Sequence, residues 1–341
     1  MERESGHRGR IYLAIGIAAL ALFFLFWFAI VADFLLLAFG SVLLAVFLRG
    51  LGNILSKYSP LSSGAAFAAV TLSFVGVTVL SGIVLAPRFA EQVEEFAHQL
   101  PAFLDDAEAF LLDVPLGEHV LEGIRNTLGE NNKELPGILA SLLPPALQAL
   151  VYGFIVFIGG LYLGVNPGWY VNGIVRLFPL GRRELVRHTL NEVGRTLRWF
   201  LIGRAVSMVA VGVLTTVGLS IIGIPLAGLL GVLAGILTFI PYAGPIAAAF
   251  PIGIVALLEG PAELVYALVF YTAVQSVEGF WITPVVQERA ILLPPFVTIA
   301  AELLMGLLFG ALGVIVSVPL AGAVMVLVKI VYVENVLEDT G

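Results

Sequence analysis

The sequence predicts an all-α polytopic membrane protein with about eight transmembrane helices, Gly/Pro-broken segments and an extramembrane amphipathic helical insertion. Apolar residues make up 60% of the 341 residues and charged residues only 12%, whereas soluble domains average about 45–50% and about 25%. The apolar residues form runs long enough to cross a bilayer, which takes about 20 residues. Several runs are interrupted by glycine and proline. This composition disfavours a soluble enzyme.

The apolar runs give the expected order of the spans. The first run, residues 11–31, follows three arginines and lacks a small-residue cleavage site, so it is expected to be a retained helix rather than a removed signal peptide. Asp33 marks an expected turn into the second run. The further expected spans cover residues 34–48, 61–86, 146–166, 199–222, 226–258, 262–283 and 294–331.

The charged residues predict how these spans are oriented. Residues 88–142 carry eleven acidic and three basic side chains, whereas residues 167–198 carry six arginines and two glutamates. Because basic loops stay in the cytoplasm, the arginine-rich segment is expected on the cytoplasmic side and the acidic segment outside. One span separates the two segments and three precede the first, so span count and charge bias agree. Both chain ends are then cytoplasmic.

These boundaries divide the chain into six parts. Apolar residues at three- and four-residue steps predict amphipathic helices in the acidic segment. Their apolar faces are expected to pack together or rest at the membrane interface, with substrate capture as the alternative. A basic helix at 182–200 is expected to lie against the cytoplasmic headgroups, with a regulatory or gating contact as the alternative. The parts are 1–87 (transmembrane helices 1–3), 88–142 (acidic external insertion), 143–166 (transmembrane helix 4), 167–198 (basic cytoplasmic loop and amphipathic helix), 199–333 (transmembrane helices 5–8 with the broken segments) and 334–341 (cytoplasmic tail).

Two runs, residues 226–258 and 294–331, are too long and too interrupted to be single regular spans. Shifted by 78 residues, they match at 8 of 19 positions, including Pro241 with Pro319. Proline removes a backbone donor and glycine loosens a helix, so freed carbonyls and amides can face a substrate. Paired interruptions of this kind indicate a transporter site near the midplane. The alternative is that the glycines only let helices pack closely.

Few ionisable residues lie deep in the apolar runs, where a charge costs about 2.5–3.5 kcal/mol or more. Glu302 is expected to be protonated, to have a partner such as Arg204 or Arg289, or to face a water-filled cavity. The last two would make it part of a cation or proton path, and the alternative is a structural hydrogen bond. Glu278 is the second carboxyl candidate, with an interfacial position as its alternative. Arg204 is expected to extend to lipid phosphates at the cytoplasmic face.

Several function classes find no support in the sequence. The chain has no cysteine, and its four histidines are scattered, so disulfides, thiolate chemistry and metal clusters are not indicated. The net charge of −7 has the opposite sign from the one that nucleic-acid binding requires. No G-x-S-x-G elbow, H-E-x-x-H, P-loop or Gly-rich dinucleotide fingerprint is present. We therefore expect no enzyme, no cofactor and no metal, and transport that depends on a gradient rather than on ATP.

Four stretches occur in a specific order behind three spans and a long polar segment. They read RLFPLGRRELVRHTLNEVGRTLRWFLIGR (176–204), IGIPLAGLLGVLAGILTFIPYAGPIAAAFP (222–251), VEGFWITPVVQERAILLPP (277–295) and GLLFGALGVIVSVPLAG (306–322). Together they resemble the autoinducer-2 exporter family of prokaryotic permeases, over most of the chain. The resemblance implies an eight-helix core with cytoplasmic ends, a helical insertion before the fourth helix and a homo-oligomer. Members of that family look like exporters of autoinducer-2 or like sodium or lithium/proton antiporters.

The family motifs map onto individual residues. The motif IPY-x-GP falls on Pro241, Tyr242, Gly244 and Pro245, the motif E-x(5)-P on Glu278 and Pro284, and the motif G-x-x-G-x(5)-P on Gly310, Gly313 and Pro319. Together with Glu302, which matches none of these motifs, they are the candidate residues of a transport pathway.

The predicted function is a gradient-driven transporter in the cytoplasmic membrane of a prokaryote that exports a small polar solute, such as an autoinducer-2-like signal molecule. One alternative is a sodium or lithium/proton antiporter, for which Glu302 and then Glu278 are the candidate titrating groups. An alternative of another class is a non-transporting membrane scaffold or regulator. The expected partners are the lipid bilayer, the solute, further copies of the chain and, for the antiporter, Na⁺, Li⁺ and H⁺.

Overall fold

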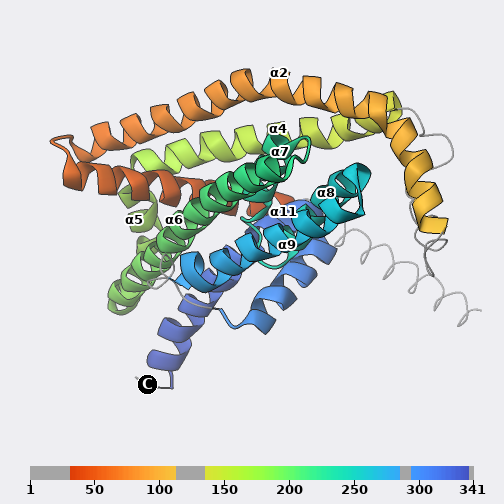
Figure 1. The fold of residues 1–341 in the computed structure, drawn as a ribbon. Coiled ribbons are helices and arrows are strands. Elements are labelled where there is room, and N and C mark those ends of the chain that lie inside the picture. Colours follow the sequence, from red (N-terminus) through yellow and green to blue (C-terminus); the bar gives the residue numbers. More distant parts are fainter. Residues whose placement is uncertain (1–30, 113–134, 285–292, 338–341) are drawn as a thin grey trace, which may run out of the picture.

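The computed structural model describes residues 31–112, 135–284 and 293–337 (Figure 1). All elements in these ranges are helical, which confirms the predicted fold class. The first predicted span, residues 11–31, lies outside this part except for its last residue. Six described helices are long and apolar enough to cross a membrane, and they cover Val31–Tyr58, Ser63–Val84, Leu147–Val165, Leu180–Ile222, Pro261–Ile282 and Pro295–Glu334.

The labelled elements follow the helix Val31–Tyr58 in chain order. They are α2 (Ser63–Leu112), α4 (Leu135–Val165), α5 (Pro167–Arg176), the 3₁₀ turn η1 (Leu180–Arg182), α6 (Arg183–Ile222), α7 (Ala227–Leu237), α8 (Ala243–Glu259), α9 (Pro261–Val277), the π-helical turn η2 (Glu278–Ile282), α11 (Pro295–Leu327) and the π-helical turn η3 (Val328–Glu334).

The helix Val31–Tyr58 contains Asp33, so the predicted turn at Asp33 is wrong. A single aspartate among strong helix formers does not end a helix, because no proline or glycine accompanies it. The helix packs closely on glycines of α4. An ideal Cβ on Gly160 of α4 would lie 3.0 Å from the Cβ of Leu44. This close approach fits the packing role of small residues in membrane helices.

The long helix α2 joins the third span to the start of the acidic segment without interruption. Its 50 residues correspond to about 75 Å, more than twice the roughly 30 Å hydrocarbon core of a bilayer. Figure 1 shows α2 and α4 side by side along one edge of the molecule. The amphipathic helices predicted for residues 113–134 lie outside the described residues.

The helix α6 also runs through a predicted boundary. We expected a separate basic helix at 182–200, but a single 40-residue helix extends from Arg183 to Ile222, a length of about 60 Å. It contains no proline that would break it, and it ends at Gly223, whose left-handed φ of 90° suits a helix C-cap. Residues 183–200 are thus helical, but their basic turns continue directly into the span instead of ending before it. Their expected position against the headgroups stays a prediction.

Glycines bring α6 and α7 into backbone contact. An ideal Cβ on Gly235 would lie 2.6 Å from the carbonyl oxygen of Met208 and 3.1 Å from the Cα of Gly212. Small residues at such a contact let two helix backbones approach closely. The packing explanation for these glycines thus holds at α7. The core that grows from this contact is Val211, Leu219, Ile224, Ala227, Leu230, Ala234, Ala248, Ile252, Val255, Ala256, Ala267, Tyr271 and Val274.

The predicted break in residues 226–258 is present between α7 and α8. Residues 238–242 leave the helix, and Tyr242 adopts a left-handed φ of 53°. Pro241 cannot donate a backbone hydrogen bond. Two residues later, the amide of Ala243 donates a 2.5 Å hydrogen bond to the Pro241 carbonyl oxygen, which closes a tight turn. Gly244 allows the turn, because a Cβ there would collide with the Leu237 carbonyl group.

The second predicted break lies at Gly310 rather than at Pro319. Gly310 has φ 60° and ψ −146° inside α11, and an ideal Cβ on Gly306 would lie 2.8 Å from the Val314 side chain. Residues eight apart would be about 12 Å apart along a continuous helix, so the chain folds back at Gly310. Pro319 lies nine residues later, buried within the helix. A proline costs one intrahelical hydrogen bond, which packed membrane helices tolerate.

Candidate functional site

Four elements of the C-terminal half meet around one buried arginine, Arg204 of α6. Its side chain is 10% exposed, so the expected contact with lipid phosphates is wrong. Nη1 lies 3.7 Å from Oε1 of Glu278, which begins η2, and donates a 3.4 Å hydrogen bond to the Thr238 carbonyl oxygen at the α7–α8 break. The break therefore provides a backbone acceptor for a buried cation.

The rest of the Arg204 side chain faces α6 itself. The guanidinium carbon lies 5.7 Å from the centre of the Phe200 ring, one turn earlier on the same face, a distance at which the ring attracts a cation. Nε is buried and has no hydrogen-bond partner among the described residues. Arg204 thus has hydrogen-bonding capacity that these neighbours do not use.

Glu278 is held by the turn that follows α9. It is 8% exposed, and the hydroxyl of Thr283 donates a 2.6 Å hydrogen bond to its Oε1, the same oxygen that faces Arg204. Glu278 and Thr283 flank η2, a π-helical turn. Such turns occur frequently at functional sites. Here the turn brings a hydroxyl five residues later onto the carboxylate.

Glu302 enters the same region from α11. It is 5% exposed, and its Oε1 has no hydrogen-bond partner among the described residues. Arg204 is close enough to its carboxyl group to interact with it electrostatically. Glu302 therefore adds a second buried carboxyl group near the guanidinium of Arg204.

We refer to Arg204, Thr238, Glu278, Thr283 and Glu302 as the Arg204 cluster. It contains two carboxyl groups and one guanidinium, so it carries a net charge of −1 when both carboxyl groups are ionised. A buried charge without a partner is costly, and binding one proton or one monovalent cation would neutralise the excess. No group of three His, Cys, Asp or Glu residues suitable for a metal ion occurs in the described ranges.

Two further buried polar groups lie next to the cluster in sequence. Ser207 follows Arg204 by three residues on the same face of α6, and Gln275 precedes Glu278 by three residues on α9. The Ser207 hydroxyl and the Gln275 amide nitrogen are buried without a hydrogen-bond partner in the part of the chain that the structure covers. Hydroxyl and amide groups of this kind suit a polar solute.

The candidate residues of the sequence analysis divide into two groups. The structure brings Tyr242, Glu278 and Glu302 together around Arg204. Of the others, Gly244 shapes the α7–α8 turn, and the Pro245 carbonyl accepts a 3.2 Å hydrogen bond from the Tyr271 hydroxyl.

The remaining candidates are not among the residues that define the Arg204 cluster, although Pro284 directly follows Thr283. Pro284 is exposed at the end of a described segment, and Arg289 lies outside the described residues. Gly310 forms the reversal of α11, Gly313 packs against the Met305 backbone, and Pro319 is buried in the following helix. Their positions support the shape of α11 rather than a direct role at the cluster.

The sequence analysis missed Thr238 and Thr283. Thr238 offers its backbone carbonyl, a group that every residue has, so no side-chain pattern marks it. Thr283 lies inside the E-x(5)-P motif, five residues after Glu278 and directly before Pro284. A hydroxyl at that spacing reaches the carboxylate only because the turn between them is π-helical. The motif therefore contains Thr283, but a regular α-helix would not have brought its hydroxyl to Glu278.

Comparison with known proteins identifies the family of the chain. Residues 17–332 match the sequence model of the AI-2E family transporters. YueF of Bacillus subtilis, which carries the name of a transport protein, is 24% identical over 273 residues, covering 75% of this chain and 73% of YueF. PerM of Escherichia coli, which carries the name of a permease, is 25% identical over 264 residues, covering 74% of each chain. MT0215 of Mycobacterium tuberculosis, also named as a transport protein, is 29% identical over 281 residues, covering 80% of this chain and 73% of MT0215.

Proposed function

Since the chain belongs to the AI-2E transporter family, and is thus a membrane transporter rather than an enzyme, we propose that it is a gradient-driven exporter of a small polar solute that does not use ATP. The observation that carries the proposal is the Arg204 cluster. Charged and hydroxyl groups are buried where α7 stops and α8 begins. Interrupted helices with buried polar groups are how membrane transporters build a binding site. An autoinducer-2-like signal molecule, rich in hydroxyl groups, fits these donors and acceptors.

The transport path in this proposal runs along the α7–α8 break and the reversal of α11. The residues proposed to line it are Pro241, Tyr242, Gly244, Pro245, Glu278, Pro284, Glu302, Gly310, Gly313 and Pro319. Arg204 is added because it contacts two elements at once, the break and η2. Motion of the two parts of α11, before and after Gly310, relative to α6 would change from which side of the membrane the cluster is accessible.

A second candidate function is sodium or lithium/proton antiport, and Glu302 favours it. Its carboxyl group is buried with one oxygen unpartnered among the described residues, and the cluster has one more acid than base. A site of this composition can hold either a proton or one alkali cation, but not both, which is the requirement for coupled exchange. Glu278 is the weaker candidate, because Thr283 and Arg204 already occupy its Oε1.

Sidedness and assembly belong to the same proposal. The arginine-rich start of α6 is placed in the cytoplasm by the positive-inside rule, with the acidic segment after the third span outside. Only 6% of the apolar window of α2 and 11% of that of α4 are buried within the monomer. These helices therefore have faces free for lipid or for further copies of the chain, in line with a homo-oligomer in the bilayer.

Reconstituted vesicles test the two functions separately. Efflux of autoinducer-2 loaded into the vesicles supports export, and collapse of an imposed pH gradient on addition of Na⁺ or Li⁺ supports antiport. Protein that does neither is a scaffold or regulator, which would refute the proposal.

Glu302→Gln keeps the size of the side chain and removes its charge, so we expect it to abolish antiport while the protein still folds. Glu259→Gln, at the exposed end of α8, is the matched control and should exchange normally. Unchanged exchange by the Glu302 variant would remove Glu302 from the mechanism.

A further inference from the structure

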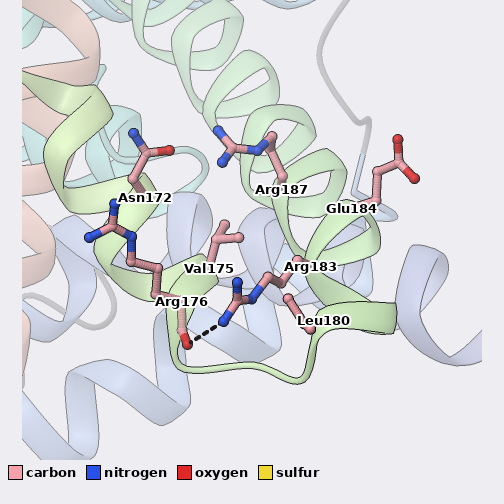
Figure 2. Close-up of a pocket in the computed structure, with 7 residues that line it drawn as sticks. All are labelled: Asn172, Val175, Arg176, Leu180, Arg183, Glu184 and Arg187. Atoms are coloured by element: carbon pink, nitrogen blue, oxygen red, sulfur yellow. Dashed lines mark hydrogen bonds between the residues drawn. The ribbon is translucent and has the colours of Figure 1, made fainter.

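A second polar site lies at the corner between α5 and the start of α6, where its residue Arg187 is about 25 Å along α6 from Arg204. A pocket of about 540 Å³ is lined there by Asn172, Val175, Arg176, Leu180, Arg183, Glu184 and Arg187. Three of the seven residues are arginines. Figure 2 shows the polar ends of Asn172 and Arg176, from α5, and of Arg187, from α6, on the same side of the pocket.

The pocket is preformed by one of its own arginines. Nε of Arg183 donates a 3.1 Å hydrogen bond to the Phe178 carbonyl, and its Nη2 donates a 3.3 Å hydrogen bond to the Arg176 carbonyl (Figure 2). These bonds hold the turn between α5 and α6 in place. The Arg183 guanidinium group therefore lies beside the pocket with donors bonded to the backbone. Arg176 and Arg187 are the two lining arginines that can bind a ligand.

The charges of the pocket fit an anion. Glu184 is its single acidic lining residue, and Figure 2 shows its carboxylate directed away from the three guanidinium groups. Arginine binds phosphate particularly well, because its planar fork donates two hydrogen bonds to two oxygens of one group. The ligand class that matches two such forks and an amide is a phosphate ester.

The surroundings of the pocket place it at a membrane surface. The helix α5 starts two residues after the span of α4 ends at Val165, and Figure 1 shows it leading from the end of α4 to the start of α6. Large apolar side chains beside the pocket are exposed, among them Trp169 (79%), Leu177 (83%) and Leu180 (80%). Tryptophan is enriched at the level of lipid headgroups, and exposed leucines there contact acyl chains rather than water.

We propose that this pocket binds the phosphate group of an anionic phospholipid, with Arg176 and Arg187 as the phosphate ligands, Asn172 as an additional donor and Trp169, Leu177 and Leu180 against the acyl chains. Basic pockets beside membrane helices on the cytoplasmic side are suited to such headgroups. The bound lipid would join α5 to α6 and so fix the link between the fourth and fifth spans. This role is independent of which solute the transporter moves.

Lipid binding to the full-length protein in detergent micelles tests the proposal without any transport assay. The probes are cardiolipin and phosphatidylglycerol as anionic lipids, phosphatidylcholine as the zwitterionic lipid, and inorganic phosphate, with binding measured by native mass spectrometry. We expect anionic lipid to bind at a discrete stoichiometry and phosphatidylcholine to bind at least about tenfold more weakly, since it carries no net charge.

Charge-matched double variants locate the site. Arg176→Gln with Arg187→Gln should weaken cardiolipin binding about 25-fold, at roughly fivefold per arginine. Arg182→Gln with Arg195→Gln removes the same charge from the same segment outside the pocket, and it should change binding less than about twofold. Helix content by circular dichroism checks that both double variants fold.

Three results would overturn the inference. Equal losses in the two double variants would mean a diffuse electrostatic field rather than a pocket. Inorganic phosphate that binds as tightly as cardiolipin would mean a site for a soluble phosphate compound. Leucine-to-serine changes at Leu177 and Leu180 that leave cardiolipin binding unchanged would show that the acyl chains make no contact there.

Discussion

The Arg204–Glu278 pair offers a quantitative test of the buried cluster. The two charged groups are 3.7 Å apart and their side chains are 10% and 11% exposed. At an effective dielectric constant near 20, two unit charges at that distance attract each other by about 4 kcal/mol. Removing one partner of a buried pair costs about 3–5 kcal/mol, because the other charge is left buried without compensation.

The stoichiometry of the cluster predicts an asymmetry between the two partners. Arg204→Met leaves Glu278 and Glu302 without a counter-charge, so we expect a loss of about 3–5 kcal/mol in the free energy of unfolding. Glu278→Gln leaves Arg204 beside Glu302, so the loss should be smaller, about 1–3 kcal/mol. The double variant should lose about 2 kcal/mol less than the sum of the two single variants.

Unfolding of the purified protein in mixed micelles of rising dodecyl sulfate content, followed by far-ultraviolet circular dichroism, measures these free energies. The ion pair between Arg195 and Glu192 supplies the control cycle, because its side chains are 65% and 25% exposed and such pairs contribute about 0.2–1 kcal/mol. A coupling energy for Arg204 and Glu278 no larger than in this control would refute the reasoning. An equal loss for Arg204→Met and Glu278→Gln would show that Glu302 does not share the arginine.

Three further variants test the helix breaks and contacts by the same unfolding measurement. Gly310→Ala should lower the free energy of unfolding by about 1–3 kcal/mol, because Gly310 has a positive φ. Gly322→Ala in the same helix has no atom near its ideal Cβ and should leave the free energy of unfolding unchanged. Equal effects of the two substitutions would mean that the helix does not reverse at Gly310. Gly235→Leu should lose at least about 2 kcal/mol, because its side chain meets backbone atoms of α6, and a stable variant would refute the close contact. Tyr271→Phe should lose about 1 kcal/mol with its hydrogen bond to the Pro245 carbonyl, and vesicle transport should persist.

The first break could be predicted from sequence because its cause is local. Pro241 removes a backbone donor in an apolar run that is too long for one span, and Gly244 permits the turn that follows. The second break could not be placed correctly by the same argument. The repeat offset of 78 residues pairs Pro241 with Pro319, yet the chain reverses at Gly310, where the backbone needs a positive φ rather than a missing donor.

The sequence shows which ionisable residues lie within apolar runs, but it does not show which residues they contact. Arg204, Glu278 and Glu302 stand out in the sequence as ionisable residues in apolar runs. Which face of a helix each one occupies depends on the neighbouring helices, and those neighbours are 74 to 98 residues away from Arg204 in the chain. The long helices α2 and α6 show a similar limit. Charge marks where each helix leaves the apolar layer, but a change in polarity does not by itself break hydrogen bonding along a helix.

The reversal at Gly310 determines in which compartment the chain finishes. A continuous, mainly apolar helix of 33 residues would have its two ends on opposite sides of the membrane, whereas a helix that folds back has both ends on the same side. The part of α11 before the reversal, residues 295–309, is about 22 Å long. It is therefore too short to cross the hydrocarbon core of a bilayer, which is about 30 Å thick. A phosphatase reporter fused behind residue 337 and one placed ahead of Pro295 should therefore give the same signal, either both active or both silent.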